Sequence, residues 1–139
     1  MMRGFKAAAL LMLVCCVSMT ASAQRFKGRF INEELKINLD LNVYSDSLPV
    51  PGLEGLETCY GVLKGDINGV WLMLKVHEVT ENRVLVRAAC DRGNDAEDLE
   101  LTMDGENLMV RQVKGVYIKG VKEGKYIKLP KPLVMKRLM

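Results

Sequence analysis

Few side chains in this sequence could perform covalent or metal chemistry. His77 is the only histidine, and beyond the first 23 residues the only cysteines and serines are Cys59, Cys90, Ser45 and Ser47. One histidine cannot build a zinc site of two or three histidines, and neither cysteine lies in a Cys-x-x-Cys pair. Neither serine stands in a Gly-x-Ser-x-Gly motif, and no phosphate-binding glycine loop is present. The sequence therefore predicts a protein without catalysis, cofactor or metal.

Acidic residues gather between positions 91 and 100, where a pair of carboxylates could act on glycosidic bonds. The oxygen ligands Asp91, Asn94, Asp95, Glu97 and Asp98 could also hold calcium, but their spacing differs from the Asp-x-Asp-x-Asp-Gly loop. A cluster within one loop is more typical of a solvated turn. We expect a polar turn here, with a weak calcium site as the alternative.

The residues most suited to binding are aromatic. Asn68-Gly69 suits a two-residue type I′ turn, which would pair Ile67 with Val70 and place Leu63, Leu72, Leu74 and Val76 on the core face. The opposite face would then need cover, and the apolar loop 45–57 is expected to fold over it as a flap. The flap and this face form the predicted site for a ligand or partner, made of Tyr60, Trp71, Met73, His77 and Leu53.

Periodicity predicts the elements that position these residues. Residues 35–44 alternate strictly, with Leu35, Ile37, Leu39, Leu41 and Val43 on one face, as in a half-buried strand. Further β-type runs, broken by turn residues, are expected at 60–67, 70–79, 83–90, 99–103, 107–113, 116–121, 125–129 and 133–138. Residues 26–31 add a first strand that could pair with the last and close the sheet. The predicted fold is all-β: one antiparallel meander of about eight or nine short strands, forming a small lipocalin-like barrel or a sandwich.

The two cysteines test this topology. If 80–82 is a three-residue loop, Val76 pairs with Val86 and Leu72 with Cys90, which leaves Cys59 roughly 20 Å from Cys90 at the usual strand spacings. A disulfide needs Cα atoms within about 7 Å. We therefore predict that the thiols are unpaired, with Cys90 buried, and that Cys59 and His77 lie on opposite sheet faces.

Residues 1–23 have the pattern of a cleaved signal peptide. Arg3 and Lys6 precede an apolar run of about 13 residues, shorter than the roughly 20 that span a bilayer as a helix, and Ala21-Ser22-Ala23 precedes Gln24. A lipoprotein signal at Cys15 or Cys16 is a weaker alternative. We expect export to the periplasm or the medium, and a single domain over residues 24–139 with no transmembrane segment.

Charge is nearly balanced but unevenly placed. Without Arg3 and Lys6, 18 basic residues stand against 17 acidic ones, which gives no reason to expect nucleic-acid binding. Acids predominate in residues 91–106 and bases in residues 114–137, which begin with Lys114 and end with Arg137. Weak contact with an anionic envelope surface is an interpretation of this basic end, although isolated lysines on strands are more typical of a solvated face.

The alanine-rich signal before Gln24, the β-hairpins, and the Lys-Leu-Pro-Lys-Pro segment before a basic last strand resemble small exported proteins of Gram-negative bacteria with lipocalin-like or sandwich folds. The resemblance is architectural and implies no site residue. We expect a non-catalytic binding protein for a small apolar ligand. The alternatives are an inhibitor or immunity-type protein that binds another exported protein, and an envelope enzyme of unrecognised type.

Overall fold

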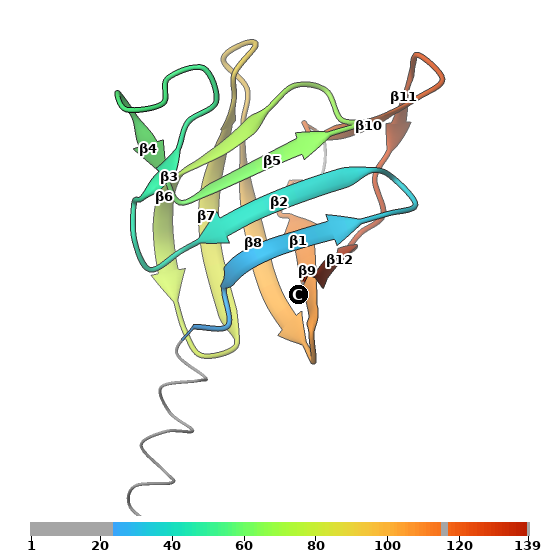
Figure 1. Ribbon diagram of the computed structural model, residues 1–139. Coiled ribbons are helices and arrows are strands. Elements are labelled where there is room, and N and C mark those ends of the chain that lie inside the picture. The colour runs from blue at the N-terminus through green and yellow to red at the C-terminus, as the bar shows by residue number, and fades with distance from the viewer. Residues whose placement is uncertain (1–23, 115–116, 139) are drawn as a thin grey trace, which may run out of the picture.

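The chain folds into a closed antiparallel barrel of eight strands, with no helix among the residues described (Figure 1). The computed structural model describes residues 24–114 and 117–138, so the predicted signal peptide lies outside the described residues. The barrel strands are β1 (Lys27–Asn32), β2 (Ile37–Asn42), β5 (Gly61–Gly65), β6 (Trp71–Val79), β7 (Arg83–Cys90), β8 (Ala96–Asp104), β9 (Asn107–Gln112) and β12 (Leu133–Arg137). The predicted all-β meander is confirmed, and its form is a barrel.

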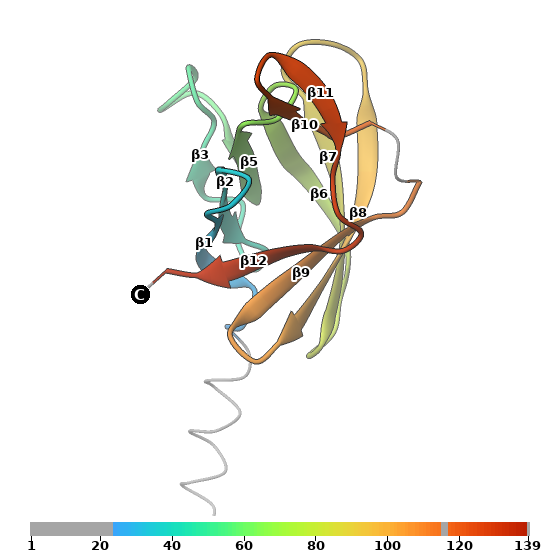
Figure 2. The same cartoon turned by 90° about the vertical axis from the view of Figure 1, so that its right-hand side faces the viewer.

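Two small hairpins are inserted into the meander. Strand β3 (Leu48–Pro49) lies in the predicted flap and pairs with β4 (Thr58–Cys59), which directly follows the flap, and β10 (Lys119–Lys122) pairs with β11 (Lys125–Lys128). The connection from β5 to β6 and the β10–β11 hairpin meet at one end of the barrel, through a bridge between Ile67 and Gly120 (Figure 2).

The first and last strands close the barrel, as the sequence predicts. Phe30 pairs with Arg137, and the Arg137 guanidinium donates hydrogen bonds to the carbonyls of Lys27 (2.6 Å) and Arg25 (2.5 Å). The same guanidinium lies 4.7 Å from the centre of the Phe30 ring. One arginine thus joins both ends of the described chain.

The core is the interior of this barrel. On β2, Ile37, Leu39 and Leu41 point inward, which confirms the predicted alternation. The largest side chains that are fully buried include Trp71, Phe26, Phe30, Met73 and Met135, and they belong to one continuous cluster. Inward positions along the strands are therefore occupied by protein atoms packed against each other.

The predicted register around Asn68-Gly69 is wrong. Leu63 pairs with Trp71 and Gly61 with Met73. This register is shifted by three residues from the one that a two-residue turn at Asn68-Gly69 would give. Because side chains alternate, an odd shift turns the residues at the start of β6, from Trp71 to Met73, to the other face. Trp71 and Met73 therefore point into the barrel and Leu72 points out.

Candidate functional site

The five side chains predicted to form a binding face do not share one surface. Trp71 and Met73 lie inside the barrel with no exposed area, and Tyr60 is half-buried against the core. His77 lies outside on β6, and Leu53 is exposed in the flap. The face that would have joined Trp71 to His77 does not exist in this register.

The flap does cover an apolar face, but with other residues beneath it. Val50 and Cys59 form a buried cluster with Val62, and Leu48, Val70 and Leu72 pack against it. This second, small core lies on the outer side of β5 and β6. The flap is thus part of the folded structure, and only its tip, with Leu53 and Leu56, reaches solvent.

Both thiols are free, as the predicted topology requires. Cys90, which was expected to be buried, is only half-buried, whereas Cys59 is 1% exposed. Burial under the flap raises the pKa of the Cys59 thiol. The prediction that Cys59 and His77 lie on opposite faces is wrong, since both lie outside the barrel. The two side chains nevertheless have different partners, because the Cys59 thiol donates to the Gly61 carbonyl and His77 lies near Asp98.

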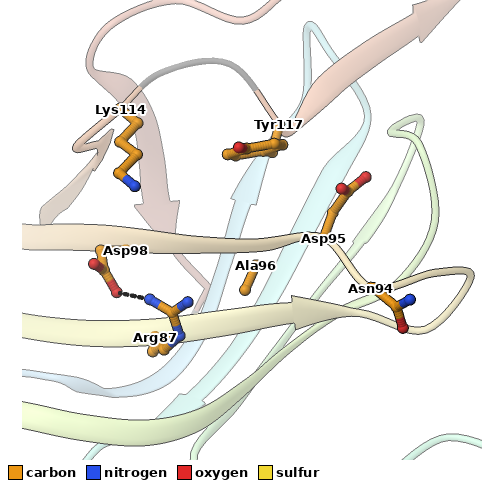
Figure 3. A pocket seen from close by; sticks show the side chains of 7 residues that line it. All are labelled: Arg87, Asn94, Asp95, Ala96, Asp98, Lys114 and Tyr117. Carbon is orange, nitrogen blue, oxygen red and sulfur yellow. Dashed lines mark hydrogen bonds and ion pairs between the residues drawn. The ribbon is translucent and has the colours of Figure 1, made fainter.

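A polar pocket lies against the outer side of β7 and β8. Its volume is about 210 Å³, and it is lined by Arg87, Asn94, Asp95, Ala96, Asp98, Lys114 and Tyr117 (Figure 3). Three separate stretches of chain meet there: β7, the turn into β8, and the segment after β9. The predicted polar turn ends where β8 begins at Ala96, and its residues Asn94 and Asp95, with Ala96 and Asp98 of β8, supply one wall of the pocket.

The floor of this pocket is a cross-strand ion pair. Arg87 and Asp98 lie directly opposite each other, and Arg87 Nη1 is 3.0 Å from Asp98 Oδ1. His77 Nε2 is 3.8 Å from the same oxygen. Both members of the Arg87–Asp98 pair remain partly exposed. Guanidinium and carboxylate groups that the pair does not use can therefore form hydrogen bonds in the pocket.

The opposite wall is held by two hydrogen bonds to other parts of the chain. The backbone nitrogen of Lys114 donates to Glu97 Oε1 at 3.1 Å, and Glu97 is only 1% exposed. The Tyr117 carbonyl accepts a bond of 2.8 Å from the Asn68 side chain. With these two positions held, the Lys114 side chain points toward the strand that carries Asp98 (Figure 3).

The pocket offers charges of both signs. Arg87 and Lys114 are cationic, Asp95 and Asp98 are anionic, and Tyr117 adds an aromatic ring with a hydroxyl. Such a set can bind polar groups by charge-assisted hydrogen bonds. Sequence reasoning missed Arg87, Lys114 and Tyr117, because their places beside the acidic turn depend on the registers of β7 and β9 against β8 and on the hydrogen bond from Asn68 to Tyr117.

The described residues contain neither a cluster of metal ligands nor a helix that could span a membrane. Within residues 24–114 and 117–138, no three side chains of His, Cys, Asp or Glu come together as metal ligands. That part of the chain also contains no helix with the length and apolar character needed to cross a bilayer. Comparison of the chain with models of protein families, with curated proteins and with solved structures finds no match in any of the three.

Proposed function

We propose that this chain is an exported, non-catalytic binding protein that takes a small polar ligand in the pocket between Arg87, Asp98 and Lys114. The observation that carries the proposal is the contrast between a filled barrel and a charged pocket on its outside. The apolar ligand expected from the sequence has less support, because buried side chains occupy the inward positions. A ligand with both a cationic and an anionic group would match the charges best.

Export is supported by the sequence pattern before Gln24 and by the position of the first core residue. Phe26 is fully buried, so cleavage after Ala23 would leave the whole described core intact. Amino-terminal sequencing of the protein from the periplasm or medium should begin at Gln24. A protein that stays in the cytoplasm with residues 1–23 attached would contradict this part of the proposal.

The ligand is tested by native mass spectrometry of protein purified from its own cellular extract. We expect an added mass that is retained in the wild type and lost in Tyr117→Ala and Lys114→Ala. Tyr126→Ala is the matched control, because this tyrosine is 68% exposed and lies on the β10–β11 hairpin. A clean apo mass in every sample would overturn the ligand proposal.

The second candidate is an inhibitor or immunity-type protein that binds another exported protein. Its support is the separation of charge, with acids in residues 91–106 and bases in residues 114–137. Complementary charge steers association and selects partners. An affinity pull-down from periplasmic extract, repeated at high salt, would recover a specific partner in this case. Contact of residues 114–137 with an anionic envelope surface remains part of the proposal.

A further inference from the structure

The β10–β11 hairpin places lysines directly opposite lysines. Lys119 pairs with Lys128, and Lys122 pairs with Lys125. Like charges at directly opposed positions destabilise a β-ribbon. Among the residues that the structure describes, the ion pairs with carboxylates are made by arginines, apart from a contact of 3.8 Å between His77 and Asp98, so Lys119 and Lys128 form no ion pair with a carboxylate.

The hairpin is nevertheless firmly attached to the end of the barrel. The nitrogen of Val121 donates to the Asp66 carbonyl at 2.8 Å, and the nitrogen of Asn68 donates to the Lys119 carbonyl at 3.0 Å. Ile118 and Leu129, which flank the two strands, are buried. The lysines therefore stand on a ribbon of defined orientation at one end of the molecule (Figures 1 and 2).

The two sides of the hairpin differ in charge. A hollow of about 280 Å³ on one side is bordered by Lys36 and Lys122 but also by three carboxylates, those of Glu34, Asp66 and Glu123. A hollow of about 500 Å³ on the other side contains no carboxylate, and its lining is Gln112, Ile118, Lys119, Tyr126, Ile127, Lys128 and Leu129. The only charged side chains among the described residues of this second side, which we call the cationic side, are therefore lysines.

Tyr126 lies in the middle of this cationic side. Its ring is 68% exposed, and Lys119 Nζ lies 5.9 Å from the ring centre. A tyrosine has an apolar ring and a polar hydroxyl, and it therefore suits the boundary between water and hydrocarbon. Lysines beside such a ring can reach phosphate groups at the same depth.

We propose that the cationic side of the β10–β11 hairpin docks on the surface of a bilayer that contains anionic phospholipids. A bilayer is favoured over an acidic protein because the exposed Tyr126 ring shares this side with Lys119 and Lys128. A layer of mobile anionic headgroups can neutralise both lysines and also receive the ring, without a matching pattern of carboxylates. The inference rests on the proposed export only for its biological setting, since binding itself is measured on the purified protein.

The test is co-sedimentation with vesicles of phosphatidylcholine, with and without phosphatidylglycerol. We expect binding only to the mixed vesicles, and its loss at high salt because salt screens exposed charges. Each lysine near an anionic surface contributes roughly fivefold in partitioning. The double substitution Lys119→Gln, Lys128→Gln should therefore lower partitioning roughly 25-fold.

The matched control is Lys27→Gln with Lys75→Gln, which removes the same charge from exposed lysines on β1 and β6. It should bind within about twofold of the wild type if location matters and total charge does not. Equal binding to neutral vesicles or an equal loss in the control would overturn the proposal. Native mass spectrometry of the pocket ligand does not depend on these lysine variants. A failure of vesicle binding is therefore distinguishable from a failure of the proposed ligand binding in the pocket.

Discussion

The side-chain oxygen of Asn68 lies 3.3 Å from the indole nitrogen of Trp71 and accepts its hydrogen bond. The same oxygen accepts a bond of 3.0 Å from the backbone nitrogen of Lys119, while the Asn68 amide donates to the Tyr117 carbonyl. One turn residue thus completes the bonding of the buried tryptophan and joins the β10–β11 hairpin to the barrel.

Asn68→Ala should lower the free energy of unfolding by about 1–3 kcal/mol, because a buried indole N–H loses its acceptor. Urea unfolding followed by tryptophan fluorescence measures this directly, since Trp71 is the only tryptophan. The control Asn94→Ala alters an exposed side chain and should change stability by less than about 0.5 kcal/mol. Similar stability of the two variants would show that the Asn68 contacts contribute nothing.

Gly61→Ala should destabilise the barrel by about 1–3 kcal/mol through overpacking. A Cβ at this position would lie 2.5 Å from Met73 Sδ and 3.2 Å from Leu41 Cδ1. Gly93→Ala is the matched control, because a Cβ there meets nothing within 4 Å. Thermal unfolding of both variants is the measurement, and an unchanged midpoint for Gly61→Ala would contradict the observed pairing of Gly61 with Met73.

Stability should fall in acid partly through Glu100. Hydrogen bonds from Arg111 (3.1 Å) and Arg83 (2.7 Å) hold the pKa of this carboxyl below its usual range. A depressed pKa in the folded state contributes stability above the unfolded pKa of about 4.3, and that contribution is lost as pH falls through the folded value. Glu100→Gln should therefore reduce stability at neutral pH and narrow its gap from the wild type in acid.

Urea midpoints measured across this range test the sign. Glu81→Gln serves as the control, because Glu81 is exposed and lies in the turn between β6 and β7. If the gap between Glu100→Gln and the wild type stayed constant from neutral to acidic pH, the two arginine contacts would not be responsible for the stability difference.

The two thiols should react at different rates in the native protein. Cys90 is half-buried, whereas Cys59 is covered by the flap and its pKa is raised by burial. Iodoacetamide followed by mass spectrometry should modify Cys90 first and Cys59 only after unfolding. Cys90→Ser should leave a native protein that is nearly unreactive, while Cys59→Ser should keep the fast site. Rapid modification of Cys59 in the native state would mean that the flap opens readily.

Strand positions were predictable because each strand carries its own alternation and its own turn residues. The span of β7 and the inward residues of β2 follow directly from local pattern, and pairing of the first strand with the last follows from the need to remove exposed edges. The apolar residues of 45–57 also predicted a segment that folds against the barrel, and Val50 is buried there.

The register of β6 was not predictable in this way. Between Met73 and Lys75, and again between Val76 and Glu78, an extra residue interrupts the pairing with β7. Each bulge reverses the alternation. The predicted pairing of Val76 with Val86 is confirmed, yet Trp71 and Met73 face the core while Leu72 and Leu74 do not.

The sequence by itself therefore determined an all-β chain, the approximate positions of its barrel strands and the uneven distribution of its charges, since these depend on residues close together along the chain. Only the tertiary structure decided which face of β6 is inside, what lies beneath the flap and where a pocket forms. The reason is physical: a bulge changes the face of a strand without changing its composition. The registers of β7, β8 and β9 and a hydrogen bond from Asn68 join Arg87, Asp98, Lys114 and Tyr117 from segments that share no local pattern.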